Sequence, residues 1–114
     1  MLIDMRQLHG IYIVCGKTDL RRGIDGLANV VTHQFELDPY NKALYLFCGT
    51  RKDRFKALWD GDGFILLYKR IEDGRLQWPL NQDEVRKLHT KQFVRLLSGW
   101  AIDRPYIQSP CIKS

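Results

Sequence analysis

Two strand-length segments joined by a short turn constrain the fold of this chain more than any other feature. Residues 51–59 and 64–70 are rich in aromatic and aliphatic side chains, and the four residues between them read Asp-Gly-Asp-Gly. Aspartate and glycine readily adopt the backbone angles of turns. The pattern therefore predicts an antiparallel hairpin, with Trp59 opposite Phe64.

This hairpin carries several positive charges. The expected register sets Arg54 opposite Lys69 and places Lys56 on the same face of the sheet as Lys69. Like charges at this spacing repel each other unless an anion lies between them. The hairpin is therefore a candidate surface for binding a polyanion.

A second turn and two apolar runs extend the expected sheet. Residues 72–75 contain an Asp-Gly pair that suits a type I′ turn, which would pair Lys69 with Trp78. Residues 11–15 and 43–48 are short apolar runs closed by glycine, as in buried strands. The chain is thus expected to contain about five strands.

Helical patterns precede and follow these strands. Apolar residues recur at helical spacing over residues 24–35, and this helix should end by residues 38–39, because proline disfavours a helical residue before it. Residues 81–84 resemble a capping box that would start a further helix. Thr90 is expected to cap another short segment, which would end at Gly99.

The order strand, helix, four strands and helices predicts an α+β fold. We expect a mostly antiparallel sheet packed with one N-terminal helix and short C-terminal helices. A length of 114 residues fits a single domain, with its core at residues 11–102 and an irregular tail at residues 103–114.

The three cysteines of the chain do not follow the spacing of a disulfide framework or a metal site. Cys15, Cys48 and Cys111 form no C-x-x-C pair and have no histidine at ligand spacing, so neither a disulfide framework nor a zinc site is predicted. No apolar run reaches the roughly 18 residues of a membrane span, and the N-terminus lacks a signal-peptide pattern. We expect a cytoplasmic protein without a cofactor or a membrane partner.

Positive charge is the main candidate for function. Lysine and arginine number 18 against 13 aspartates and glutamates, which gives a net charge of +5 and suits a phosphate backbone. A solvated basic surface is the alternative interpretation. The predicted phosphate contacts, the first four being the primary ones, are Arg51, Lys52, Arg54, Lys56, Arg21, Arg22, Lys69 and Arg70. Such contacts position the sugar–phosphate backbone of a nucleic acid and do not recognise its base sequence.

Aromatic and acidic residues of the hairpin each admit two interpretations. Phe55, Trp59 or Tyr68 could stack on unpaired bases, but large rings are also the main material of a small core, which we favour for them. Asp60 and Asp62 resemble a fragment of a metal loop. The further oxygen ligands that calcium needs are missing, so a turn is the better explanation and no metal is predicted.

Several short blocks of this chain resemble, in order and spacing, a known family. This is the small accessory protein of the insertion-sequence sixty-six family of bacterial transposons, called TnpB or Orf-two-like. The blocks cover most of residues 11–102, and none of them is a catalytic signature. They lie at residues 18–27, 46–49, 51–56, 60–64, 68–70, 78–79 and 96–99.

The resemblance implies an accessory protein that is encoded beside the transposase and needed for efficient transposition, while strand transfer belongs to the larger transposase. We therefore expect a protein without enzymatic activity that binds DNA, or the transposase–DNA complex, through a basic sheet surface. Its expected partners are the transposase, other proteins of the same element, and DNA. The alternative is a module that docks on the transposase without contacting nucleic acid. A metal-dependent nuclease is the least favoured interpretation.

The chain departs from the family pattern at one position. Relatives carry an additional aromatic or aliphatic residue between the positions of Leu58 and Trp59, which are adjacent here. Side chains alternate between the faces of a strand, so the loss of one residue reverses the faces on one side unless a bulge absorbs it. The face assignments in the hairpin therefore depend on its register.

Overall fold

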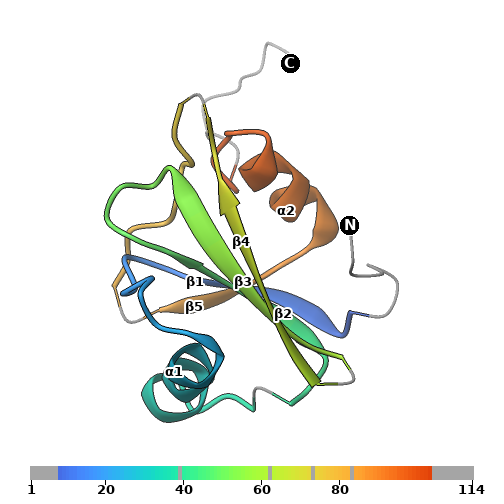
Figure 1. Cartoon of the computed structure of the whole chain (residues 1–114). Coiled ribbons are helices and arrows are strands. Elements are labelled where there is room, and N and C mark those ends of the chain that lie inside the picture. Colours follow the sequence, from blue (N-terminus) through green and yellow to red (C-terminus); the bar gives the residue numbers. More distant parts are fainter. Residues whose placement is uncertain (1–7, 39, 62, 73, 83, 104–114) are drawn as a thin grey trace.

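A single five-stranded sheet forms the centre of the molecule. The computed structural model describes residues 8–38, 40–61, 63–72, 74–82 and 84–103. The strands lie in the order β4-β3-β2-β1-β5 (Figure 1). Only β1 and β2 run parallel, which confirms the predicted α+β fold with a mostly antiparallel sheet. The strands are β1 Gly10–Val14, β2 Ala43–Cys48, β3 Arg54–Gly61, β4 Gly63–Arg70 and β5 Val85–Leu88.

The central strand β2 is buried on both faces, which explains its unbroken apolar sequence. Because side chains alternate along a strand, β2 contributes to two cores. Leu44 and Leu46 belong to the cluster that packs under α2, and Tyr45 and Phe47 belong to the cluster under α1. We call these two sides of the sheet the α2 face and the α1 face.

The N-terminal helix lies where its apolar spacing predicted. α1, Ile24–Asn29, continues directly into a π-helical segment, Val30–Gln34, and packs on one face of the sheet (Figure 1). The helix begins after Gly23. The Asp19 carboxylate accepts a hydrogen bond from the amide of Arg21, 3.0 Å away.

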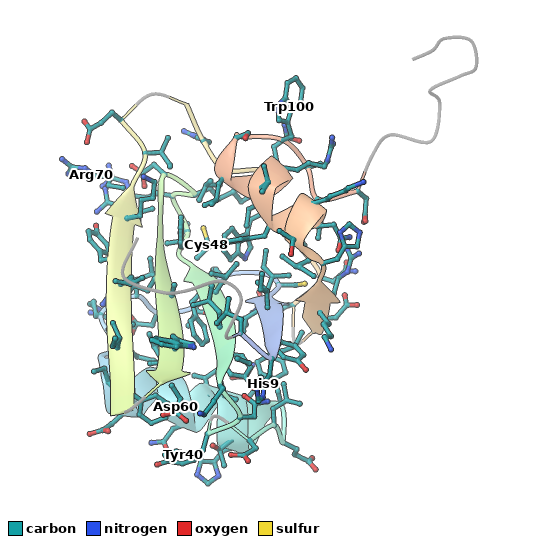
Figure 2. All side chains as sticks on the ribbon, turned by 90° about the vertical axis from the view of Figure 1, so that its right-hand side faces the viewer. His9, Tyr40, Cys48, Asp60, Arg70 and Trp100 are labelled. Carbon is teal, nitrogen blue, oxygen red and sulfur yellow. The ribbon has the colours of Figure 1, made fainter. Side chains whose placement is uncertain are left out.

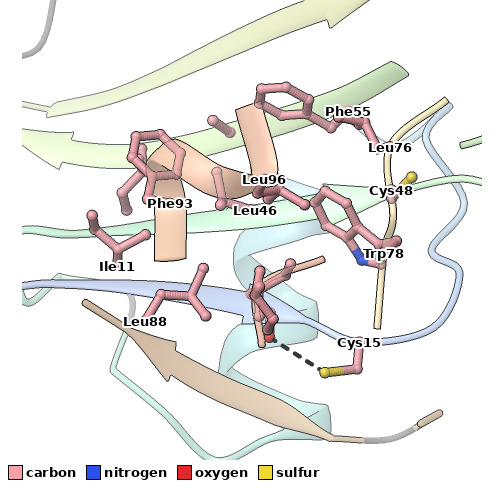
Figure 3. Close-up of a cluster of buried hydrophobic side chains, with 14 residues drawn as sticks. Ile11, Cys15, Leu46, Cys48, Phe55, Leu76, Trp78, Leu88, Phe93 and Leu96 are labelled. Carbon is pink, nitrogen blue, oxygen red and sulfur yellow. Dashed lines mark hydrogen bonds between the residues drawn. The ribbon is translucent and has the colours of Figure 1, made fainter. Parts of the chain in front are cut away.

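The strand expected after the second turn does not form. The amide of Leu76 donates to the carbonyl of Lys52, and both Leu76 and Trp78 are buried in the cluster under α2 (Figure 3). The predicted pairing of Lys69 with Trp78 was therefore wrong. An added edge strand would leave the indole beside a lysine, whereas the observed path removes it from water. The predicted type I′ turn includes Asp73, which lies outside the described residues.

The fifth strand lies later in the chain than predicted. β5 pairs antiparallel with β1 where the capping box was expected to start a helix. Val85 and Leu88 face opposite cores, so the strand buries apolar side chains on both sides of the sheet. The side chains of Asn81 and Glu84 do form a hydrogen bond of 2.9 Å, but it belongs to the loop before β5. The predicted helix start was therefore wrong.

One C-terminal helix is present within the described residues. α2, Thr90–Leu97, is capped by the His89 side chain in a capping box with Gln92, one residue before the predicted cap. Gly99 follows with a φ of +88°, as predicted for the end of this helix. No helix in the described part of the chain is long and apolar enough to cross a membrane.

The β3–β4 hairpin is shifted by one residue from the predicted register. Gly61 pairs with Gly63, so the turn is tighter than the four residues assigned to it from the sequence. Trp59 consequently lies opposite Ile65 and not opposite Phe64. The pairing then continues residue for residue along both strands, with no bulge in the described register.

This shift changes which cations share a face. Lys56 pairs with Tyr68 on the α1 face, and Arg54 pairs with Arg70 on the same face. Lys69 pairs with Phe55 on the α2 face. The prediction that Lys56 and Lys69 share a face was therefore wrong, because a slip of one residue exchanges the two faces of a strand.

Gly16 directly follows the end of β1 and Cys15, and it is the glycine whose replacement should matter most. Its φ is +75°, its amide donates to the carbonyl of Pro79, and an added Cβ would lie 3.1 Å from the backbone of Gln82. We expect Gly16→Ala to cost more than the roughly 1–2 kcal/mol of the left-handed backbone alone. Gly74→Ala is the matched control, because Gly74 has a φ of +83° with open space around it. Equal losses in urea unfolding would contradict the contact with Gln82.

Candidate nucleic-acid interface

A groove of about 600 Å³ opens on the α1 face. It lies between the turn that precedes α1, the loop that joins β2 to β3, and the paired strands β3 and β4. Its lining brings together segments that are far apart in the sequence. The lining residues are Thr18, Asp19, Leu20, Arg21, Gly49, Thr50, Arg51, Arg54, Lys56, Leu66 and Tyr68.

Four of the eight cations predicted from the sequence line this groove. Arg21 comes from the turn before α1, Arg51 from the β2–β3 loop, and Arg54 and Lys56 from β3. Asp19 is the one carboxylate among the lining residues. The groove is therefore a local concentration of positive charge.

Lys56 connects the sheet to the turn before α1. Its side chain extends from the α1 face of β3, and Nζ donates to the carbonyl of Arg22 at 3.1 Å. The same Nζ lies 6.0 Å from the centroid of the Tyr68 ring. Lys56 is thus held in place by a backbone acceptor and has no carboxylate partner among the described residues.

Arg54 is held between an acid and a phenol. Nε and Nη2 donate to the two carboxylate oxygens of Asp53 at 2.9 and 3.2 Å, and Nη1 donates to the Tyr68 hydroxyl at 3.2 Å. The hydrogen bonds from Arg54 lower the pKa of Asp53. The guanidinium of Arg54 is thus fixed in the groove lining, and the carboxylate of Asp53 offsets part of its positive charge.

Arg21 has a similar arrangement but is far more exposed. Its Nε and Nη2 donate to Asp19 at 3.0 Å each, and its side chain is 91% exposed. Hydrogen bonds from Arg21 lower the pKa of Asp19 to about 2. An ion pair this exposed adds little to stability, so a phosphate can replace the carboxylate at small cost.

Arg51 is the least constrained cation of the groove. Within the described part of the chain its side chain makes no hydrogen bond or ion pair, and it is exposed. Its charge reaches Asp53, whose pKa it helps to lower. Arg51 is therefore available for an anion that enters the groove.

The structure does not bring the other four predicted cations into the groove lining. Arg22 contributes a carbonyl to Lys56 and has an exposed side chain, and Arg70 lies opposite Arg54 with Glu72 3.7 Å away. Lys52 lines a neighbouring hollow of about 220 Å³. Lys69 lies on the opposite face of the sheet.

The three aromatic side chains of the hairpin that the sequence offered for base stacking also separate. Phe55 is buried in the cluster under α2, and Trp59 packs against the same cluster, as predicted for core residues. Tyr68 is 53% exposed and lines the groove, so the prediction of a core position was wrong for this ring. Sequence reasoning missed the apolar lining residues Leu20 and Leu66, because nothing local in the sequence shows that they meet.

Metal and thiol chemistry receive no support from the described residues. No group of three or more His, Cys, Asp or Glu side chains converges there. Cys15 and Cys48 are buried, and burial raises the pKa of the Cys48 thiol to about 11, which keeps it protonated. Asp62 and Cys111 lie outside the described residues.

Comparison with known proteins places the groove within a shared sequence region. The family model described as IS66 Orf2 like protein matches residues 9–106, a range that contains every lining residue. Two similar proteins come from Sinorhizobium fredii (strain NBRC 101917 / NGR234). Uncharacterized protein y4hO is 34% identical over 90 residues, 78% of either chain. Uncharacterized protein y4jC is 32% identical over 90 residues, 78% of this chain and 77% of that one. No solved structure matches the chain significantly.

Proposed function

This chain belongs to the IS66 Orf2-like family of transposition accessory proteins, and from that premise we propose that it binds DNA through the groove without catalysing a reaction itself. The observation that carries the proposal is the convergence of four cations from three separate segments. A concave surface on which positive charges outnumber negative ones concentrates anions. Phosphate groups of DNA are the anions that an accessory protein of transposition meets.

The geometry of the arginines supports phosphate as the ligand. A guanidinium donates hydrogen bonds as a planar fork, which matches two oxygens of a phosphate as well as those of a carboxylate. Asp19 and Asp53 already hold Arg21 and Arg54 through such forks. These carboxylates orient the cations in the absence of DNA.

A dependence of affinity on salt tests this proposal. Three or four phosphate contacts release condensed counter-ions, so a plot of log K against log salt should have a slope between about −2 and −4. The measurement is fluorescence anisotropy of a labelled oligonucleotide at increasing sodium chloride concentration. An affinity that does not change with salt would remove the proposal.

A second candidate function is docking on the transposase without DNA contact. It is favoured by large apolar side chains that are exposed and do not line the groove, Val94 at 55% and Trp100 at 60%. Trp100 points outward beside α2 (Figure 2). Co-precipitation with purified transposase separates the two functions. Binding that persists after nuclease treatment, and after charge reversal at Arg51 and Arg54, would favour docking.

A further inference from the structure

We propose that the groove binds an unpaired stretch of DNA, in which one base stacks on Tyr68 and the neighbouring phosphates contact Arg21, Arg51 and Arg54. This inference rests on the proposed DNA binding and goes further, because it names the form of the nucleic acid. It also assigns a role to an aromatic ring that the phosphate contacts leave unexplained.

The size and lining of the groove fit a nucleotide better than a duplex. A volume of about 600 Å³ lies in the range of pockets for small organic molecules, the class to which a nucleotide belongs. Leu20 and Leu66 contribute apolar surface to the same lining as the cations. Apolar surface suits the flat face of a base, which a duplex keeps stacked inside and a single strand exposes.

Of the four hairpin rings, Tyr68 is the one that lines the groove. Phe64, also on β4, is partly buried against the cluster under α1 and contacts Tyr40. Phe55 and Trp59 belong to the core on the opposite face. Tyr68 lies on β4, at the edge of the sheet, and 53% of the residue is exposed. The ring of Tyr68 is therefore accessible to a ligand at this edge of the sheet.

Two contacts hold the Tyr68 ring in place before any ligand binds. Its hydroxyl accepts a hydrogen bond from Arg54 Nη1 at 3.2 Å, and Lys56 Nζ lies 6.0 Å from the ring centroid. Lys56 is itself bonded to the carbonyl of Arg22. A ring that is already ordered loses little conformational entropy on binding, which favours its use as a stacking platform.

The cations then provide contacts for the DNA phosphates that neighbour the stacked base. Arg51 and Arg21 come from two different loops. Arg54 lies on β3, and its guanidinium donates hydrogen bonds to both Asp53 and Tyr68. Phosphate contacts from separate loops suit a strand that passes through the groove. A free nucleotide offers the same chemistry but only one phosphate position, so the test must separate the two ligands.

The test compares three labelled probes by fluorescence anisotropy: a 12-nucleotide single strand, its duplex, and an abasic strand of the same length and charge. We expect the wild-type protein to bind the base-bearing single strand most tightly. Tyr68→Leu should weaken that binding by about 10-fold, the value of one stacked base, and leave the abasic strand unchanged. Tyr68→Phe should retain most of the affinity, because the ring remains.

Tyr40→Leu is the matched control. Tyr40 is also an exposed tyrosine, at 69%, but it contacts Phe64 and lies near Asp60, at the end of the hairpin opposite Arg70 (Figure 2). We expect this variant to bind all three probes as the wild type does.

Three outcomes would overturn the inference. These are an equal loss of affinity for the base-bearing and abasic strands in Tyr68→Leu, a duplex bound more tightly than the single strand, or a deoxynucleoside monophosphate that competes as well as the strand. In each case salt-dependent binding would leave the proposed function intact. Absence of binding to every probe would contradict both proposals.

Discussion

Replacing Trp78 with alanine is expected to lower the free energy of unfolding by about 3–5 kcal/mol. The residue is 4% exposed, its ring centroid lies 6.3 Å from that of Phe55, and its indole nitrogen donates to the carbonyl of Val14 at 2.9 Å. Alanine would open a cavity between the sheet and the segment that crosses it, and would leave a buried carbonyl without its donor. This loss is a large part of the roughly 5–15 kcal/mol that stabilises a typical domain.

Urea unfolding followed by circular dichroism measures this effect against two controls. Trp78→Phe keeps most of the apolar volume and removes the hydrogen bond, so its loss should be smaller. Leu80→Ala changes a residue two positions later that is 66% exposed, and its effect should stay within about 0.5 kcal/mol. A Trp78→Ala loss no larger than that of Leu80→Ala would contradict the burial of Trp78 in the cluster under α2.

The second large effect concerns binding. Replacing Arg21 and Arg51 together with glutamine is expected to weaken binding of the 12-nucleotide single strand by about 30-fold at low salt. Each unit charge close to a phosphate changes the affinity by about fivefold even in water. The slope of log K against log salt should also shrink in magnitude by about 1.4, because two counter-ion-releasing contacts are lost.

The control for this pair removes the same net charge from the other side of the sheet. Lys69 lies on the α2 face and Lys91 lies on α2, and both are exposed. Lys69→Gln with Lys91→Gln should therefore leave the affinity almost unchanged. Equal weakening by the two double variants would show that net charge attracts the DNA and that the groove does not. Salt titrations by anisotropy on both variants make the comparison.

Lys56 and Lys69 lie on opposite faces of the hairpin, which the sequence pattern did not predict. The apolar composition and the Asp-Gly turn predicted both strands correctly. The faces depended on whether Gly61 and Gly63 belong to the turn or to the strands, and a local pattern does not decide this. An error of one residue was enough to place one predicted phosphate contact on the wrong face.

In the segment between β4 and α2, the local sequence pattern predicted different elements from those that form. Locally, residues 75–78 fit a strand after an Asp-Gly turn, and residues 81–84 fit a helix start. In the folded molecule Trp78 fills the core under α2, and Val85–Leu88 pairs with the open edge of β1. Burial against distant parts of the chain outweighed the local preferences.

The sequence by itself determined the elements whose signals are local: the apolar run of β2, the helical spacing over residues 24–35, the two hairpin strands and the family to which the chain belongs. Only the tertiary structure decided which cations meet. Arg21 and Arg51 are 30 positions apart in the chain yet line one groove, whereas Lys69, close in sequence to Tyr68, points away from it. The physical reason is that periodicity specifies which side of an element is buried, while register and long-range packing determine what lies beside it.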